Sequence, residues 1–384
     1  MTTCRAAVME APGNISVRHL PVAEPGPGAV ILAINLSGIC GTDKHTYKGE
    51  SKQYGGTPHE RDLTYPLVCG HENVGVVVAT GGDVRASDGT VLRPGDRVVP
   101  GANVPCGSCY YCLGDFPYYL CQHLEDYGNS LHLGSGDGPF GGWSEYLHLL
   151  PRTPIFRVPE NLPDTVAVIT EVMAVTHGID KALATLQTGR GSAAGFSVAV
   201  LGLGPLGACH LAKSRMLGAG TVAAIDVMPE RLAHMAGFGI DLALDASTTD
   251  VQQRKDAARE ATNGLGFDIV VDCSGRPETF PEATGLARNG GVVIEAGAFV
   301  DLGPVPFNPS SALCTPNLTI MGIGGEEATH YEPSLKLMSA NLDRYPLTAI
   351  TTHVLPLEDA EAAVHLAMSP TAMQVAINPR STAA

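Results

Sequence analysis

The feature that most constrains the fold is a glycine-rich turn between an apolar strand and a helix. An apolar run at 196–201 leads directly into the turn, a helix-like run follows at 208–217, and a second apolar run at 221–225 ends in Asp226. The turn consists of Gly202, Leu203, Gly204, Pro205, Leu206 and Gly207. Strand, turn, helix and strand with an acidic end predict a dinucleotide-binding βαβ unit, in which glycine lets the backbone approach a pyrophosphate.

The surrounding chain predicts two kinds of domain. Further strand-like runs at 267–272, 291–295 and 318–322 favour an α/β nucleotide-binding domain with a doubly wound parallel sheet, the Rossmann arrangement. The first 150 or so residues instead show short apolar runs broken by Gly, Pro and Asp, a pattern typical of small β-rich barrels with functional loops. A chain of 384 residues is long enough for two or three such domains.

Charge and composition exclude some classes of partner. A formal net charge of −15 argues against nucleic acid and against anionic membrane surfaces, both of which attract basic faces. No apolar run reaches the roughly 18 residues that span a bilayer, and no signal-peptide core follows the start of the chain. We therefore expect a cytoplasmic protein without membrane or nucleic-acid partners.

A stretch between Gly38 and Gly75 offers ligands for a metal. Cys40 lies in its first short run, and His71 and Glu72 lie in its last. A thiolate, an imidazole and a carboxylate would leave one position of Zn²⁺ open, as in catalytic rather than structural sites. Taken singly, a Cys or a His is more often an ordinary buried residue.

A second metal signal is a run of closely spaced cysteines. Cys106, Cys109 and Cys112 lie three positions apart and Cys121 follows. Four thiolates would close a tetrahedron around structural zinc. A disulfide is the alternative, but cysteines at this spacing seldom pair and ten cysteines are too few for a disulfide scaffold.

Glu171 stands in the middle of an apolar, helix-like run at 169–178. A buried carboxylate without a partner costs several kcal/mol, so a cation should lie near it, and zinc is the obvious candidate. The alternative is a Glu on the exposed face of an amphipathic helix.

Together these motifs resemble the zinc-dependent medium-chain alcohol dehydrogenase family over nearly the whole chain. The matching segments, in the family's order, are 38–43, 70–72, 106–121, 142–146 and 202–207. The resemblance implies a GroES-like catalytic domain at 1–176 and 324–384 around a Rossmann domain at 177–323. It also implies one catalytic and one structural zinc, NAD as cofactor, a small-molecule alcohol or carbonyl substrate, and a homo-oligomer, either dimer or tetramer.

The resemblance also implies roles for individual residues. Thr42 would accept the proton of the substrate hydroxyl and pass it through the cofactor ribose to His45. Glu171 matches the ligand position where the sorbitol, threonine and glucose dehydrogenase branches carry Glu, while Glu72 would replace a ligand transiently or lie behind the ligands. Asp226 would accept hydrogen bonds from the ribose and favour NAD over NADP; Arg231 is included as a cofactor-binding candidate, with simple solvation as its alternative.

Two departures from the family pattern concern spacing. Eight residues separate Cys112 from Cys121 where the family usually has seven, which leaves a different fourth ligand open. Cys40 and His71 are 31 positions apart because of a polar insertion near the expected mouth of the active site. Its charged residues suit a polar substrate, although such residues are often simply solvated. They are, with Lys44 just before it, Lys52, His59, Glu60 and Arg61.

Several functions remain open at this stage. The favoured one is oxidoreduction of a polyol, sugar or other hydroxy compound. A fainter resemblance, through 125–128 and 330–333, to dehydrogenases of phosphonate metabolism makes an anionic hydroxylated substrate the alternative, and a general alcohol dehydrogenase the third. A zinc-free quinone-reductase-like enzyme would lack Cys40, His71 and Glu171, and a non-catalytic nucleotide-binding protein would not need Thr42 and His45.

Overall fold

The computed structural model describes residues 2–53, 60–186 and 193–381. The chain folds into two compact units, each described below by itself. The first consists of Met1–Ala174, Glu326–Ala340 and Ile350–Ala384, and the second of Val175–Gly325 and Asn341–Ala349. Among the described residues, no helix is both long enough and apolar enough to cross a membrane.

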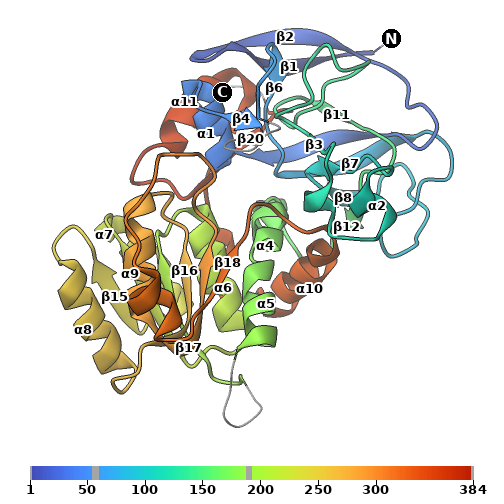
Figure 1. The fold of residues 1–384 in the computed structure, drawn as a ribbon. Coiled ribbons are helices and arrows are strands. Elements are labelled where there is room, and N and C mark those ends of the chain that lie inside the picture. Colours follow the sequence, from blue (N-terminus) through green and yellow to red (C-terminus); the bar gives the residue numbers. More distant parts are fainter. Residues whose placement is uncertain (1, 54–59, 187–192, 382–384) are drawn as a thin grey trace. The chain divides into compact units, whose positions relative to one another are not determined.

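The first unit is built on β-sheets (Figure 1). A seven-stranded sheet has the order β12-β8-β7-β3-β20-β19, with β11 also paired to β3. Its strands are β3 (Val30–Gly38), β7 (Asn73–Thr80), β8 (Arg97–Pro100), β11 (Tyr146–Leu149), β12 (Ile155–Arg157), β19 (Thr351–Pro356) and β20 (Gln374–Asn378). A three-stranded sheet contains β1 (Thr2–Ala11), β2 (Asn14–Val22) and β6 (Leu67–Val68), and two small pairs are β4 (Lys52–Gln53) with β5 (Arg61–Asp62) and β9 (Asn103–Val104) with β10 (Glu125–Asp126).

Alternating residues of β3 contribute to one hydrophobic core of this unit. Val30, Leu32 and Ile34 are buried and pack with Val77, Leu147 and their neighbours. The helices around the sheets are short: α1 (Gly41–Lys48), α2 (Tyr110–Leu113), α3 (Asp164–Ala167), α4 (Thr170–Val175), α10 (Tyr331–Asn341), α11 (Ala360–Ala367), and the 3₁₀ turns η1 (Tyr118–Leu120), η5 (Ala328–His330) and η7 (Leu357–Asp359).

The second unit is a doubly wound sheet of six parallel strands in the order β15-β14-β13-β16-β17-β18. The strands are β13 (Ser197–Leu201), β14 (Thr221–Asp226), β15 (Leu242–Asp245), β16 (Phe267–Asp272), β17 (Ala287–Glu295) and β18 (Thr319–Gly322). The helices are α5 (His177–Thr185), α6 (Pro205–Met216), α7 (Pro229–Met235), α8 (Val251–Ala261), α9 (Phe280–Leu286), a π-turn η4 (Ser310–Cys314), and the 3₁₀ turns η2 (Ala236–Phe238), η3 (Pro277–Thr279) and η6 (Leu347–Ala349).

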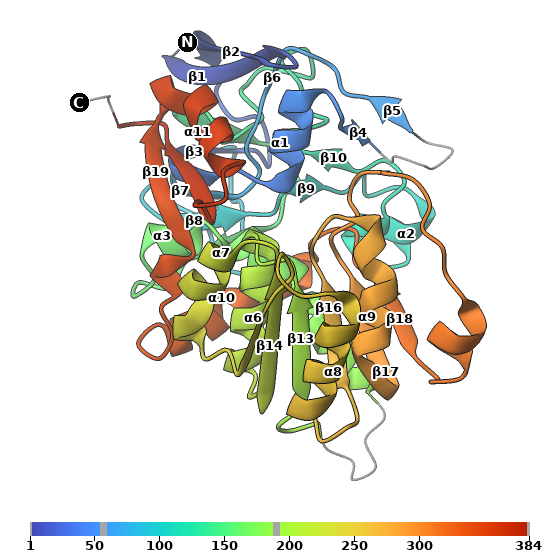
Figure 2. The same ribbon diagram turned by 90° about the vertical axis from the view of Figure 1, so that its left-hand side faces the viewer.

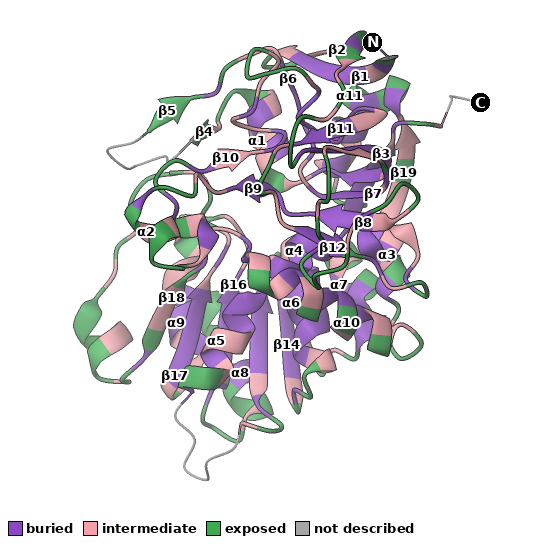
Figure 3. Ribbon diagram, turned by 90° about the vertical axis from the view of Figure 1, so that its right-hand side faces the viewer, coloured by how far each residue is buried: buried purple, intermediate pink, exposed green. Residues whose placement is uncertain are grey.

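Helices cover both faces of this sheet, with α8 and α9 on one side and α5 and α6 on the other (Figures 1 and 2). The strands β14 and β16 are largely buried, as their colour in Figure 3 shows. The predicted α/β class, with a β-rich domain and a Rossmann sheet, is therefore confirmed. One detail differs from the sequence expectation, because the helix-like run at 169–178 is divided between α4 and α5 at Thr176.

Candidate functional site

Cys40 lies directly before α1, and the buried carboxylate of Asp43 fixes its position. The Cys40 N–H donates to Asp43 Oδ2 at 2.8 Å, as side chains in the first turn of a helix often accept from the residue that precedes it. The other oxygen, Oδ1, accepts from the N–H of Gly70 at 3.3 Å. Asp43 therefore ties the segment that carries Cys40 to the loop that carries His71.

The loop before His71 depends on Gly70. This residue has φ +94°, and a Cβ on it would lie 2.4 Å from Ser37 Oγ and 2.5 Å from Trp143 Cδ1. Only glycine fits both the left-handed backbone and the lack of space. The turn brings the next two residues to the metal-ligand candidate Cys40: ligand atoms of Cys40, His71 and Glu72 all lie within 4.8 Å of one another.

Two carboxylates near this group have different positions. Glu72 is 1% exposed, belongs to the three-residue group, and accepts a hydrogen bond from Gln374 Nε2 on β20 through Oε2. Glu171, on α4, is buried as expected, but it is outside the three-residue group. Its charge nevertheless acts on both Cys40 and His71. The surface alternative for Glu171 is therefore wrong.

The electrostatics of the group fit a bound cation. Burial, with the charges of Glu171 and Asp43, raises the pKa of Cys40 to about 12. Burial lowers the pKa of His71, but carboxylates led by Asp43 and Glu171 outweigh it and raise that pKa to about 9. So much buried acid must be neutralised, either by protons or by compensating positive charge. A divalent cation would supply it, and thiolate, imidazole and carboxylate are ligands that zinc accepts.

The two residues expected to relay protons lie on α1. Thr42 Oγ1 is 3.9 Å from Cys40 Sγ, so its hydroxyl lies beside the candidate metal group. His45 is half-buried, and its Nδ1 lies 2.7 Å from Glu50 Oε2. An Nδ1–H donated to this carboxylate would leave Nε2 as the proton acceptor. The structure thus adds Glu50 as a partner that the sequence did not indicate.

The four cysteines of the segment 106–121, called the cysteine lobe from here on, lie close together. The Sγ–Sγ distances are 3.6 Å for Cys109–Cys112 and 3.9 Å for both Cys106–Cys112 and Cys109–Cys121. Four thiolates about 2.3 Å from a central zinc would be about 3.8 Å apart in a regular tetrahedron. The site therefore fits structural zinc, and Cys121 joins the group despite the longer spacing that separates it from Cys112.

Local hydrogen bonds prepare this lobe for a metal. The backbone N–H and the hydroxyl of Ser108 both donate to Cys106 Sγ and lower the pKa of Cys106 to about 5. Cys121 Sγ accepts from the N–H groups of Cys106 and His123 at 3.3 and 3.4 Å. Backbone donors stabilise the thiolate form, which is the form that binds zinc.

In the second unit, the three glycines of the turn have separate structural reasons. Gly202 has φ +82°, and a Cβ there would lie 2.7 Å from Ser274 Cα. A Cβ on Gly207 would lie 1.8 Å from the Gly202 carbonyl oxygen, so helix and strand can approach only with glycine. A Cβ on Gly204 would have no neighbouring atom within 4 Å, so the backbone at this position is open to a ligand. The three glycines of a dinucleotide-binding turn allow the tight turn, the close approach of the pyrophosphate to the backbone and the close packing of helix against strand.

The rest of this turn is held in place by Asp226 at the end of β14. Asp226 Oδ2 accepts from the N–H of Leu203 at 2.5 Å, and Oδ1 accepts from Met228 N–H at 2.8 Å. Pro205 occupies the first turn of α6, and the Leu206 carbonyl accepts from the ring of His210 at 3.0 Å. Arg231 Nη1 lies 4.0 Å from Asp226 Oδ2, and its role in cofactor binding stays a prediction.

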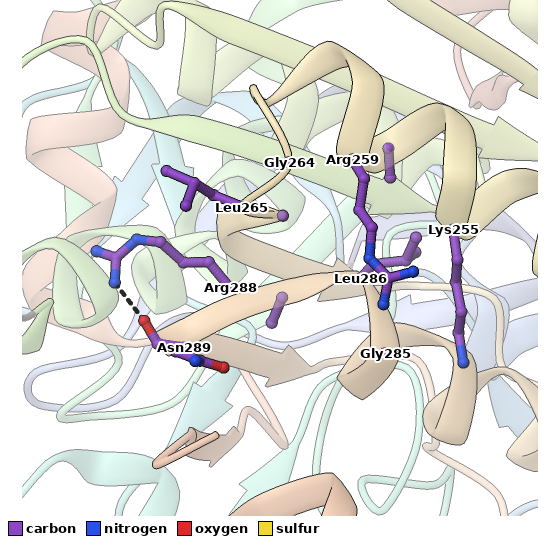
Figure 4. A pocket seen from close by; sticks show the side chains of 11 residues that line it. Lys255, Arg259, Gly264, Leu265, Gly285, Leu286, Arg288 and Asn289 are labelled. Atoms are coloured by element: carbon purple, nitrogen blue, oxygen red, sulfur yellow. Dashed lines mark hydrogen bonds between the residues drawn. The ribbon is translucent and has the colours of Figure 1, made fainter. Parts of the chain in front are cut away.

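A hollow of about 320 Å³ in the second unit is not the cofactor site (Figure 4). Lys255, Arg259 and Arg288 line it, but Arg288 pairs with Asp268 at 2.6 Å. The lining also includes Gly266, directly before β16, and Ala287, the first residue of β17. Ligands of open α/β sheets bind beyond the carboxyl ends of the strands, which is the opposite edge.

Comparisons with known proteins agree with this geometry. Residues 26–160 match the model of the alcohol dehydrogenase GroES-like domain, and residues 205–340 match that of a zinc-binding dehydrogenase. A protein of Mycobacterium tuberculosis named as an alcohol dehydrogenase is 33% identical over 363 residues, which cover 93% of this chain and 92% of the relative. The chain belongs to the zinc-dependent medium-chain alcohol dehydrogenase family.

Other relatives in the family act on several substrates. A sorbitol dehydrogenase of Halalkalibacterium halodurans is 29% identical and covered over 96% of both chains. The crystal structure of an alcohol dehydrogenase from Thermotoga maritima superposes with a TM-score of 0.89 at 29% identity, covering 99% of this chain and 100% of that one. This medium-chain dehydrogenase is thus a zinc- and NAD(P)-dependent oxidoreductase of small alcohols and carbonyls.

Sequence reasoning missed buried polar residues of the first unit that lie near the metal-ligand candidates. Examples are Asp43, Glu326 and Gln374. Asp43 could have been found from its position three residues after Cys40, which is typical of a helix-capping side chain. Glu326 and Gln374 lie far from the metal ligands in sequence, and no local pattern marks them. Of the predicted loop residues, His59 lies outside the described residues, and Lys52 pairs with Glu60 at 2.7 Å.

Proposed function

We propose that this dehydrogenase interconverts a small polar alcohol, such as a polyol, a sugar or another hydroxy compound, with its carbonyl form, using NAD. The observation that carries the proposal is the partly buried group of Cys40, His71 and Glu72, which combines zinc ligands of three chemical types. When bound, zinc polarises the substrate oxygen and lowers the pKa of the hydroxyl, and NAD takes the hydride.

In this proposal the chain's own residues hold the metals and move the proton. Cys40, His71 and Glu72 hold the catalytic zinc, with Glu171 as a further acidic residue beside it, and the four lobe cysteines hold the structural zinc. The Thr42 hydroxyl accepts the substrate proton, which leaves through His45. Glu50 orients the His45 ring by accepting from Nδ1.

A polar substrate is supported by the acidic, hydrogen-bonding surroundings of the metal group and by a sorbitol dehydrogenase among the relatives. Sites that hydrogen-bond a substrate reject analogues without the matching group far more strongly than apolar pockets do. The runner-up is an anionic hydroxylated substrate such as a hydroxyalkylphosphonate, and Arg61, exposed on β5, is the cation that would favour it. A general alcohol dehydrogenase is the third candidate.

The test compares kcat/KM with NAD for a polyol series, a hydroxyalkylphosphonate and plain aliphatic alcohols of equal size. It is repeated with Arg61→Ala and with a control, Arg93→Ala, an exposed arginine in the turn before β8. We expect a polyol to be the best substrate. A best substrate among unsubstituted aliphatic alcohols, unchanged in Arg61→Ala, would return the enzyme to the general alcohol class.

Three further expectations belong to the same proposal. We propose that the catalytic domain is formed by residues 1–176 and 324–384 and the nucleotide-binding domain by 177–323. We also propose that the enzyme works in the cytoplasm as a homo-oligomer, without nucleic-acid or membrane partners. Size-exclusion chromatography with light scattering would measure the oligomeric state directly.

A further inference from the structure

Glu326 is a buried carboxylate of the first unit that the roles above do not use. It is 3% exposed. Its Oε1 accepts two hydrogen bonds, one from Asn103 Nδ2 at 2.5 Å and one from the Tyr118 hydroxyl. Hydrogen bonds to a carboxylate are stronger than those between neutral groups, so two of them on one oxygen hold this side chain firmly.

A further neighbour of Glu326 is the metal-site candidate Glu171. Both side chains are buried and lie within hydrogen-bonding reach of each other, and the charge of Glu326 also acts on His71. Glu326 therefore contacts a residue beside the Cys40, His71 and Glu72 group without belonging to that group. Residues that hydrogen-bond to a metal ligand orient it and tune its affinity for the metal.

Tyr118 connects this carboxylate to the cysteine lobe. It lies on η1, between Cys112 and Cys121, and its ring packs against Cys109, Cys121 and Leu124. The lobe helix α2 and the strand β9, which carries Asn103, are labelled in Figures 2 and 3. Because zinc sites of four cysteines fold the chain around them, the place of the Tyr118 ring depends on a filled lobe.

We propose that Glu326 is a positioning residue that orients Glu171 at the Cys40–His71 metal site, and that Tyr118 makes this orientation depend on metal in the cysteine lobe. The two metal sites are then coupled: filling the lobe strengthens binding at the other site. The proposal rests on the metal roles given under the proposed function and is independent of the substrate.

The experiment uses cobalt binding to the metal-stripped full-length chain, because Co²⁺ bound by four thiolates and Co²⁺ bound by one have different absorption spectra. Competition with a chelator gives a dissociation constant for each site. The one-thiolate site is the Cys40, His71 and Glu72 group. Glu326→Gln should weaken cobalt binding there about 10- to 100-fold and leave cobalt binding by the four cysteines of the lobe unchanged. Tyr118→Phe should weaken the one-thiolate site in the same direction. Tyr110→Phe, an exposed tyrosine of the same lobe, is the matched control and should change neither site.

The coupling itself is tested by a double-mutant cycle. Cys121→Ser, which damages the lobe site, should weaken the one-thiolate site in the otherwise unchanged chain and have little further effect when Tyr118 is already Phe. Cobalt affinity at the one-thiolate site within twofold of normal in both Glu326→Gln and Tyr118→Phe would overturn the proposal. An equal effect of Cys121→Ser with and without Tyr118 would also overturn it.

The outcome is separable from that of the proposed function. Cobalt coupling without any dehydrogenase activity would support this proposal and refute the function. Normal dehydrogenase activity together with uncoupled metal sites would support the proposed function and refute this proposal. If the unmodified chain bound no cobalt through Cys40, both would fall.

Discussion

The preference for NAD over NADP can be worked out from the surroundings of Asp226. A 2′-phosphate would face this carboxylate, and two unit charges about 4 Å apart interact by about 4 kcal/mol at an effective dielectric constant near 20. From the sequence alone this repulsion predicts roughly a thousand-fold preference for NAD. The structure changes the magnitude because Arg231 lies 4.0 Å from the same carboxylate oxygen.

Arg231 would attract the phosphate by an amount similar to the repulsion from Asp226, so the two charge effects nearly cancel. What remains is hydrogen bonding. A carboxylate offers about four lone-pair sites. Backbone N–H groups of Leu203 and Met228 use two of them, so about two are left for ribose hydroxyls. A hydrogen bond to a charged acceptor contributes about 1.5–3 kcal/mol, so we expect a preference of about ten- to a hundred-fold.

The perturbation is Asp226→Ser, assayed as kcat/KM for NAD and NADP with one substrate at saturation. Removing the carboxylate loses the ribose acceptor and leaves the Arg231 charge, so the preference should disappear or reverse. Adding Arg231→Ala should abolish the gain with NADP. Equal kcat/KM with both cofactors in the unmodified enzyme would refute the assignment of Asp226, and an unchanged NADP rate in the double variant would refute the role of Arg231.

Four other perturbations have clear expected outcomes. Cys40→Ser should lower turnover at least about 100-fold, while the affinity for NAD, measured by fluorescence titration, stays within about twofold. Removal of metal by a chelator should abolish activity before it unfolds the chain. Full activity without metal would contradict both predictions. Cys121→Ser should lower the melting temperature by several degrees, at about 2–4 °C per kcal/mol, because the lobe loses a zinc ligand; an unchanged melting curve and zinc content would contradict this. Burial and the charge of Asp272 raise the pKa of Glu295 from 4.5 to about 7, so the folded state holds a proton that the unfolded state releases and stability falls as pH rises from about 4.5 to 7. Above pH 7 the Glu295→Gln variant should therefore have a free energy of unfolding about 1–2 kcal/mol higher than the unmodified chain, after allowance for solvent screening. The exposed control Glu278→Gln should not show this gain. Equal melting curves of Glu295→Gln and the unmodified chain across this pH range would contradict the raised pKa of Glu295.

The parts of the molecule that sequence could predict are those set by local geometry. The glycine-rich turn at 202–207 could be predicted because the positive φ of Gly202 and the close approach of Gly207 to the Gly202 carbonyl are set within the turn itself. The cysteine lobe could also be predicted, because its four candidate ligands come from one short segment of the chain. The short apolar runs of the first 150 or so residues likewise predicted strands, and the run at 30–34 lies in β3.

The residues that were missed depend on contacts far apart in the chain. Gln374 reaches Glu72 across 302 positions, and Asn103 reaches Glu326 across 223. Arg231 is a different case. It is only five residues from Asp226, but whether its side chain meets the carboxylate depends on how α7 packs after β14, which periodicity does not determine.

The charges that the structure gathers around the metal group also bear on the choice of substrate. Zinc with Cys40 and Glu72 as ligands is formally neutral, while Asp43 is buried beside them. Glu171 and Glu326 are also buried, and both act electrostatically on His71. A negative charge at any of these carboxyl groups would cost an anionic substrate about 2 kcal/mol at about 8 Å, at an effective dielectric constant near 20, and would leave a neutral polyol unaffected. Arg61 is one exposed cation against several buried acidic groups, which is why a polyol is placed ahead of a hydroxyalkylphosphonate.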